Sequence, residues 1–153
     1  MENPPLLVES FKISGKDYEH GGEASSNIKS ILKKLGITPE IIKRVSICTY
    51  EAEMNIIIYA YEGEIELNIF KDKIKVIAKD RGPGIENLEL AMKEGYSTAP
   101  PEAIELGFGA GMGLPNIKNN SDRMNIETEV GKGTILTFEV DLNAKRWKLY
   151  KLN

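Results

Sequence analysis

Hydrophobic side chains recur along the chain at two spacings, one typical of helices and the other of strands. Apolar residues three and four positions apart predict a helix that ends at Gly36 and a long helix over about residues 39–61. Thr38 followed by Pro39 favours a helix start, because proline already has the backbone angle of a first helical turn. The stripe on the long helix consists of Ile41, Val45, Cys48, Ala52, Asn55, Ile56 and Tyr59.

Alternating apolar and polar residues predict strands at 6–13, 64–69, 73–78, 125–130 and 134–140. The last four form two hairpins, which turn at 71–72 and 131–133. Two shorter helices are expected over about 86–93 and 112–123, with a long irregular stretch at 95–110 between them. These elements predict an α+β fold, a two-layer sandwich in which helices cover one face of a mixed, mostly antiparallel sheet.

The composition is that of one globular domain. Of the 153 residues, 41% are hydrophobic and 28% are charged, which argues against a disordered chain. We expect the domain over residues 4–140, followed by a short basic tail at 141–153. Within the tail, the mixed aromatic and basic run 144–151 predicts an edge strand or a frayed end, with a partner contact as the alternative.

Charge and residue counts exclude several classes of function. The net charge of −3 gives no electrostatic footprint for DNA or RNA. No apolar run reaches membrane-spanning length, and the first residues do not have the pattern of a secretory signal. The only histidine is His20 and the only cysteine is Cys48, which excludes a zinc-binding cluster of these residues and an intramolecular disulfide. We therefore expect a cytoplasmic protein whose partners are neither nucleic acid nor membrane.

Glu51 and Asn55 lie four residues apart and therefore share one face of the long helix. An asparagine on or beside an apolar stripe needs a polar partner. In a functional interpretation, Asn55 coordinates a metal ion through its amide oxygen and Glu51 serves as a base beside it. The alternative is a surface glutamate next to an asparagine that bonds a neighbouring backbone group.

Three glycine-containing segments also carry candidate chemistry. Residues 80–85, DRGPGI, end a predicted strand with glycines that allow close approach to a flat ligand, and the carboxylate of Asp80 can accept a hydrogen bond from a ligand amine. Residues 107–114, GFGAGMGL, place glycines at alternate positions before a helix, which favours phosphate binding by backbone N–H groups. This run has neither the Gly-Lys-Ser/Thr ending of a P-loop nor the parallel strands of a dinucleotide site. Residues 131–134, GKGT, and each of the other segments taken alone are also compatible with ordinary turns.

In this order and spacing, the segments resemble the conserved boxes of the GHKL ATPase superfamily, which has a HATPase_c-type domain. Residues 51–55 match its N-box, 80–85 its G1 box and 107–114 its G2 box, and 133–134 match its closing Gly-Thr pair. With the additional run 95–98, GYST, the chain is most similar to the small bacterial anti-sigma-factor regulatory serine/threonine kinases, and among them to the switch kinases of the stressosome.

The resemblance implies the Bergerat (GHKL) ATP-binding fold with a site for ATP and Mg²⁺. Glu51 would be the catalytic base, and Asn55 would be the one protein ligand of Mg²⁺. Asp80 would accept a hydrogen bond from the adenine amine, and Thr134 would support the same site through its hydroxyl. The other nucleotide-binding residues that it implies are Gly82, Gly84, Ile85, Ser97, Thr98, Gly107, Gly109, Gly111, Met112 and Gly113.

The resemblance also implies partners and rival functions. As a kinase, the protein would phosphorylate a serine or threonine of a STAS-domain antagonist in a partner-switching system. The alternatives are a nucleotide-gated anti-sigma factor that sequesters a sigma factor, an ATP sensor that transfers no phosphate, and an ordinary domain with coincidental glycines. Homodimers occur in the family. Residues 99–106 depart from the family pattern, because extra residues and two prolines lengthen and stiffen the lid, which bears on lid motion and partner choice.

Overall fold

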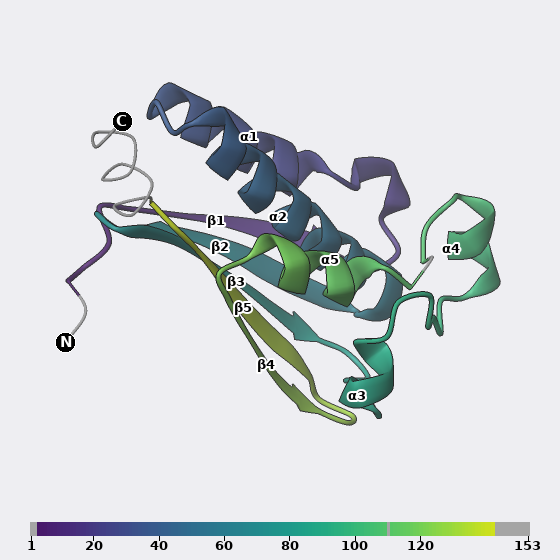
Figure 1. Cartoon of the computed structure of the whole chain (residues 1–153). Helices are drawn as coiled ribbons and strands as arrows, with labels where there is room; N and C mark the ends of the chain where they lie inside the picture. The colour runs from purple at the N-terminus through teal and green to yellow at the C-terminus, as the bar shows by residue number, and fades with distance from the viewer. Residues whose placement is uncertain (1–2, 110, 143–153) are drawn as a thin grey trace.

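A computed structural model of the chain describes residues 3–109 and 111–142, and Figure 1 shows its course. Five strands form one sheet in the order β1-β2-β3-β5-β4, and all four pairings are antiparallel. The elements are β1 (Leu7–Ser14), the 3₁₀ helix η1 (Tyr18–His20), α1 (Glu23–Lys34), α2 (Pro39–Tyr59), β2 (Glu62–Ile69), β3 (Lys73–Arg81), α3 (Leu88–Ala91), α4 (Pro101–Glu105), α5 (Gly113–Asn120), β4 (Arg123–Glu129) and β5 (Gly133–Asp141).

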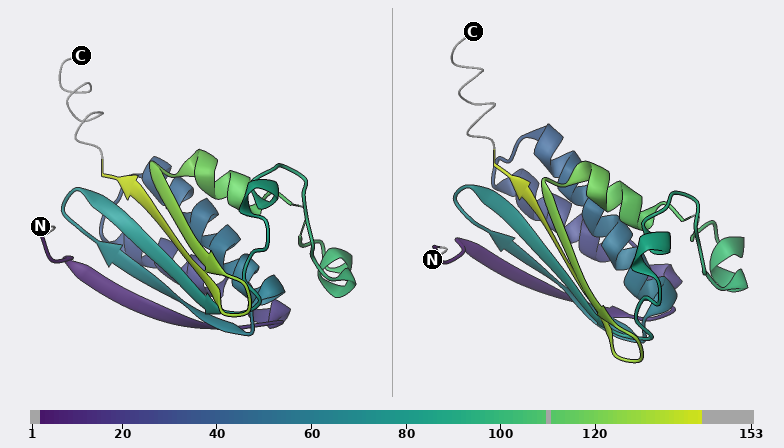
Figure 2. Two further views of the ribbon diagram at one scale, coloured as in Figure 1. Left: turned by 90° about the horizontal axis from the view of Figure 1, so that it is seen from below. Right: turned by 60° about the horizontal axis from the view of Figure 1, so that its bottom comes forward.

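The long helices and the sheet form two layers. Figures 1 and 2 show α1, α2 and α5 over one face of the sheet, with α2 between the other two. On that face, Leu67, Val76 and Phe138 lie opposite one another on β2, β3 and β5, and all three are completely buried. The core therefore lies between this face and the helices, and the predicted two-layer α+β sandwich is confirmed.

The long helix α2 is confirmed over nearly its predicted length. Pro39 occupies its first turn, and Thr38 before it has extended backbone. Its last turns contain the β-branched run 56–58, whose members are at most 3% exposed. Burial of these three isoleucines outweighs their weak intrinsic preference for helix, so the helix continues to Tyr59.

The start of α1 is held by a buried glutamate from α2. Glu53 is 1% exposed, and its carboxylate accepts hydrogen bonds from three backbone N–H groups. Gly22 N and Ala24 N donate to Oε2 over 3.0 and 3.1 Å, and Ser25 N donates to Oε1 over 2.9 Å. Gly22, at the N-cap position, has no side chain to bond these groups, so Glu53 takes the place of a capping residue.

The short helices between β3 and β4 differ from the prediction. The helix expected over 86–93 is shorter and consists of α3 alone. It begins after Asn87, whose side chain caps it by accepting a hydrogen bond from Leu90 N, and it ends at Ala91. The stretch expected to be irregular contains α4, which begins at Pro101 after an extended Pro100. The helix expected to reach 123 ends at Asn120, since β4 already begins at Arg123.

Two expectations about the chain's ends concern residues that the structure does not describe. The predicted edge strand or frayed end at 144–151 lies outside the described residues, and the division into a domain at 4–140 and a tail at 141–153 remains a prediction. Within residues 3–109 and 111–142, no helix has both the length and the apolar character needed to cross a bilayer.

Candidate functional site

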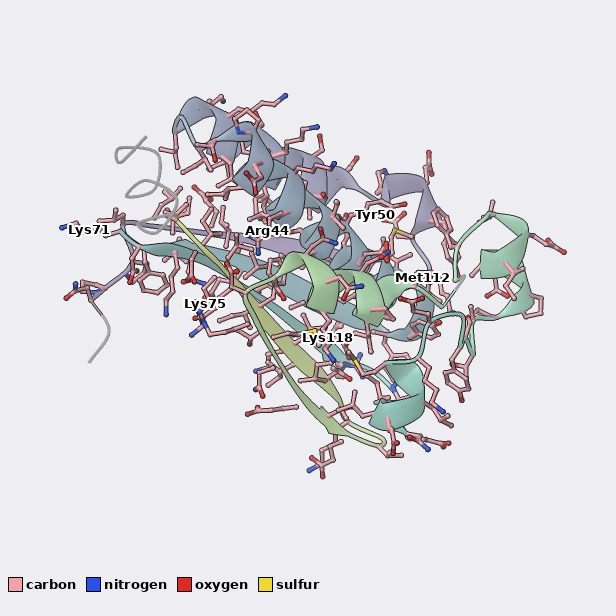
Figure 3. The ribbon with its side chains drawn as sticks, viewed as in Figure 1. Arg44, Tyr50, Lys71, Lys75, Met112 and Lys118 are labelled. Atoms are coloured by element: carbon pink, nitrogen blue, oxygen red, sulfur yellow. The ribbon has the colours of Figure 1, made fainter. Side chains whose placement is uncertain are left out.

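The predicted site residues lie where four parts of the chain meet. Three of these parts are the C-terminal half of α2, the lid at residues 95–112 and the start of α5, and the fourth is the end of β3 with the loop after it and the adjoining start of β5. Figure 3 labels Met112, the N-cap residue of α5, at the end of that helix next to the lid. Segments that are separate in the sequence are therefore brought to one end of the helical layer.

Glu51 and Asn55 share one face of α2, as their spacing predicts, and that face meets the start of α5. A β-carbon placed on Gly113 would lie 3.2 Å from Asn55 Oδ1 and 3.5 Å from Glu51 Oε2. Both side chains are half-buried, and Glu51 Oε2 also accepts a hydrogen bond from Asn116 Nδ2 over 3.3 Å. The structure thus places an amide oxygen and a carboxylate against the end of the glycine-rich segment.

Asp80 lies near the end of β3, half-buried against the β4–β5 hairpin. Thr134 N donates to its Oδ1 over 3.2 Å, and no described residue bonds its Oδ2. Burial raises the pKa of the Asp80 carboxyl above its ordinary value, and the bond from Thr134 N offsets part of that shift. One carboxylate oxygen therefore remains available to accept a hydrogen bond from a ligand amine.

Thr128 supports this corner, and the sequence analysis did not identify it. Its Oγ1 accepts from Ile85 N over 2.9 Å and lies 2.9 Å from the hydroxyl of Thr134. Thr128 and Thr134 are direct cross-strand partners on β4 and β5. The register of the predicted hairpin was the signal that could have found it, because partner threonines on one face commonly bond each other.

Two glycines are required by the packing around Asp80. Gly84 has a φ of +74°, and a β-carbon there would lie 2.4 Å from Glu129 O. Gly133 has a φ of +148°, and a β-carbon there would lie 2.2 Å from Asp80 O. Both positions combine a left-handed backbone with contact against another backbone segment, so any side chain would force the two loops apart.

The lid is attached to the rest of the molecule at several points. Gly95 N donates to Gly111 O over 3.0 Å, which ties the two ends of the lid together. The ring of Phe108 stacks on Tyr18, with centroids 5.9 Å apart and planes 10° apart. Lys16 Nζ lies 3.8 Å from Glu102 Oε1, an exposed pair that adds little stability. The lengthened lid therefore packs on η1, in the loop that follows β1.

The structure places the other predicted site residues in and around the lid. Ser97 and Thr98 are exposed, Ser97 Oγ accepts from Ala99 N in its own loop, and within the described chain neither has a hydrogen bond to Asn55 or Asp80. The remaining predicted residues lie along the two glycine-containing segments: Gly82, Gly84 and Ile85 after β3, and Gly107, Gly109, Gly111, Met112 and Gly113 before and at the start of α5.

Two hollows in the described surface lie away from this site. One of about 400 Å³ lies between β1 and α1 and is lined in part by Asp17 and His20. Another of about 540 Å³ lies between α3, α5 and β4 and is lined in part by Met92 and Met124. Asn55 and Asp80 line neither hollow, so the glycine-rich segment against α2 marks the candidate site instead.

The residues present fit a nucleotide that brings its own metal ion. Among residues 3–109 and 111–142, no group of three His, Cys, Asp or Glu side chains could hold a metal by itself. Asn55 offers a single amide oxygen, which suits Mg²⁺ because this ion retains water and takes further oxygens from phosphates. A side chain at Gly113 would lie directly against Asn55 Oδ1 and Glu51 Oε2, so the glycine there keeps both oxygens uncovered on that side.

Known proteins share this sequence pattern and fold. Residues 16–140 match the family described as the histidine kinase-like ATPase domain. Over 123 residues the chain is 29% identical to the serine/threonine-protein kinase RsbT of Bacillus subtilis. The matched stretch covers 78% of this chain and 82% of RsbT. Over 132 residues it is 30% identical to the anti-sigma F factor of Clostridium perfringens (strain SM101), covering 82% of this chain and 91% of that protein.

A solved structure has the same fold. A chain in the crystal structure of the SiaB–SiaC complex from Pseudomonas aeruginosa superposes with a TM-score of 0.54, covering 90% of this chain and 91% of that one. The two sequences are 14% identical, so this likeness concerns the fold alone.

Proposed function

Because the chain belongs to the histidine kinase-like ATPase domain family, we propose that it is an ATP- and Mg²⁺-dependent serine/threonine-protein kinase. Its substrate is a STAS-type regulatory protein of a partner-switching system. The observation that carries the proposal is the pair Glu51 and Asn55 against Gly113, because a carboxylate and an amide oxygen lie where the glycine-rich segment ends. The similarity to RsbT, named as a kinase and covered over 82% of its length, supports it.

Adenine recognition rests on Asp80. Its Oδ1 is engaged by Thr134 N, so its Oδ2 accepts a hydrogen bond from the adenine amine. Thr128 and Thr134 hold the loop after β3 against the hairpin and thereby fix the distance between Asp80 and the base.

Phosphate binding rests on backbone groups and Asn55. Gly107 N and Phe108 N already donate to carbonyl groups within the lid, so phosphate binding falls to the N–H groups nearer the start of α5, those of Gly111, Met112 and Gly113, where the helix dipole also favours negative charge. Asn55 Oδ1 would hold Mg²⁺, which would supply neutralisation of charge on the phosphates when bound.

Glu51 completes the reaction as the general base. The hydroxyl oxygen of a substrate serine or threonine attacks the γ-phosphorus and displaces ADP, while the hydroxyl proton passes to Glu51. A bond forms between the substrate oxygen and phosphorus, and the bond between phosphorus and the β,γ-bridging oxygen breaks. Positioning and charge neutralisation supply most of the acceleration.

A second candidate function is sequestration of a sigma factor. The observation in its favour is the 30% identity to an anti-sigma F factor over 91% of that protein's length. Sequestration would be supported as the principal role if the chain purifies in a stable complex with a sigma factor and a STAS protein releases the sigma factor from that complex. Phosphate on a STAS protein without such a complex would support the kinase alone.

The kinase proposal is tested by separating binding from transfer. We expect Glu51→Ala to keep its affinity for Mg·ATP and to lose transfer from γ-labelled ATP to STAS proteins of the same organism by about 10²- to 10⁴-fold. Asn55→Ala should lose the Mg²⁺-dependent part of ATP affinity, measured by calorimetry. Glu64→Ala, an exposed change on β2, is the control and should resemble wild type. Transfer at the wild-type rate by Glu51→Ala would contradict the base assignment.

A further inference from the structure

Asn116 lies one turn into α5 and contacts the proposed base directly. Its Nδ2 donates to Glu51 Oε2 over 3.3 Å. A carboxylate can only accept hydrogen bonds, so the NH₂ group of the amide is the part of Asn116 that faces it. Both side chains are half-buried, where such a bond is stronger than in open water.

Asn116 is itself fixed within the helical layer. Its backbone N–H donates to Met112 O over 2.8 Å, and its carbonyl accepts from Asn120 Nδ2 over 2.8 Å. Arg44 of α2 then donates from Nε to Asn120 O over 3.0 Å. Figure 3 labels Arg44 and Met112 along this row of contacts. The Cys48 thiol of α2 also donates to Ile117 O over 3.6 Å, so the amide that meets Glu51 is carried by a helix that α2 bonds at two further places.

The two oxygens of Glu51 are consequently not equivalent. Oε2 is held by Asn116 and lies beside Gly113, whereas no described residue bonds Oε1. A carboxylate fixed through one oxygen has its side-chain rotation restricted, which keeps the other oxygen in one direction.

We infer that Asn116 is a positioning residue for phosphoryl transfer, holding Glu51 by Oε2 so that Oε1 takes the proton of the attacking hydroxyl. The inference rests on the proposed kinase function. Because Asn116 lies three residues after the last glycine of the glycine-rich segment, it also links the geometry of the base to the position of the phosphate-binding lid.

A purely structural role for Asn116 makes different predictions. If the amide only joins α5 to α2, a substitution lowers stability and acts on turnover whether or not Glu51 is intact. If it positions the base, the substitution acts through Glu51 and has no further effect once the base is gone. A double-mutant cycle separates the two.

The experiment measures phosphate transfer from γ-labelled ATP to the STAS acceptor, and to water where no acceptor is phosphorylated. We expect Asn116→Ala to lower kcat by about 10- to 100-fold, with KM for ATP within about twofold of wild type. Asn116→Asp keeps the shape but places a second carboxylate against Glu51, so its kcat should fall at least as far. Asn119→Ala, an exposed asparagine on the same helix, is the matched control and should be unchanged.

The cycle is completed with Glu51→Gln alone and combined with Asn116→Ala. We expect no additional loss in the double variant. Wild-type kcat in Asn116→Asp, or losses that simply multiply in the double variant, would overturn the positioning role. Wild-type turnover by Glu51→Gln would overturn the base assignment and the positioning role with it, whereas no phosphate transfer by the wild-type protein, to an acceptor or to water, would overturn the proposed function, so the two failures are distinguishable. Thermal unfolding of each variant identifies any that does not fold, and the isosteric Asn116→Asp then decides.

Discussion

Three acidic side chains near the site have different environments and therefore different tasks. Glu51 and Glu53 are two positions apart on α2 and so point in different directions. Glu53 is 1% exposed and its carboxylate is fully engaged by backbone N–H groups, whereas Glu51 is half-buried and faces Gly113. Asp80 has one oxygen bonded and one available. Local contacts, and not residue type, decide which carboxylates can act on a ligand.

Asp80→Asn should separate stability from nucleotide binding. The substituted amide can still accept from Thr134 N through its oxygen, but its NH₂ group would then face the adenine amine, and two donors do not bond. We expect the affinity for ATP to fall by about 10- to 100-fold, the range for losing a hydrogen bond to a charged group. Calorimetric titration with Mg·ATP measures this, with Asp72→Asn in the exposed β2–β3 turn as control.

The same substitution should change the pH dependence of unfolding in the absence of nucleotide. Because burial raises the pKa of Asp80 in the folded state, its stabilising contribution is present at low pH and is lost as pH rises through the folded-state value. Asp80→Asn should therefore be more stable than wild type at pH 7. The difference should vanish as pH falls toward about 3.9, the ordinary value for aspartate. A variant less stable than wild type at pH 7 would contradict the burial argument.

At the scale of elements, strongly periodic segments were predictable from the sequence and short ones were not. α2 was predicted because a long apolar stripe follows Thr38 and Pro39, and the two hairpins because alternation and turn residues agree. α4 was missed because five residues are too few to show a period, and because its start depends on Pro100 and Pro101. The limit of α5 depends on where β4 begins to pair, which is a tertiary contact.

The candidate site was predictable in the same uneven way. Motif residues such as Glu51, Asn55 and Asp80 were identified because their order and spacing match a family. Thr128 and Asn116 were not, since each acts through a partner from another element that only the folded chain brings near. Ser97 and Thr98, which were predicted to bind the nucleotide, lie in an exposed loop where their role remains a prediction.

One buried carboxylate of α2 bonds the first N–H groups of α1, which makes this contact testable. Glu53→Ala should lower the free energy of unfolding by about 3 kcal/mol, because it leaves the N–H groups of Gly22, Ala24 and Ser25 without their partner. Urea denaturation followed by circular dichroism measures the change, with Glu64→Ala as control. A loss below about 1 kcal/mol would show that water or a rearranged loop satisfies these groups.

At the scale of the whole molecule, the proposed nucleotide site is assembled from all parts of the domain. Asn55 comes from the helical layer, Asp80 and Thr134 from the sheet, and the glycine-rich segment from the lid packed on η1. A ligand that contacts all of these binds the folded chain and not the unfolded one. Binding therefore adds to the stability of the entire domain and not to one loop.

Thermal unfolding with and without Mg·ATP measures that coupling. At about 100 times its Kd, ATP should add roughly 2.7 kcal/mol, which for a domain of this size raises Tm by about 5 to 10 °C. GTP should give a clearly smaller shift, because its base presents a carbonyl oxygen where adenine has an amine, and the free oxygen of Asp80 is also an acceptor. Equal shifts with both nucleotides would contradict the role of Asp80 in recognising adenine. No shift with millimolar Mg·ATP would contradict the nucleotide site as a whole, because a ligand that does not stabilise the fold cannot be joining the helical layer, the sheet and the lid.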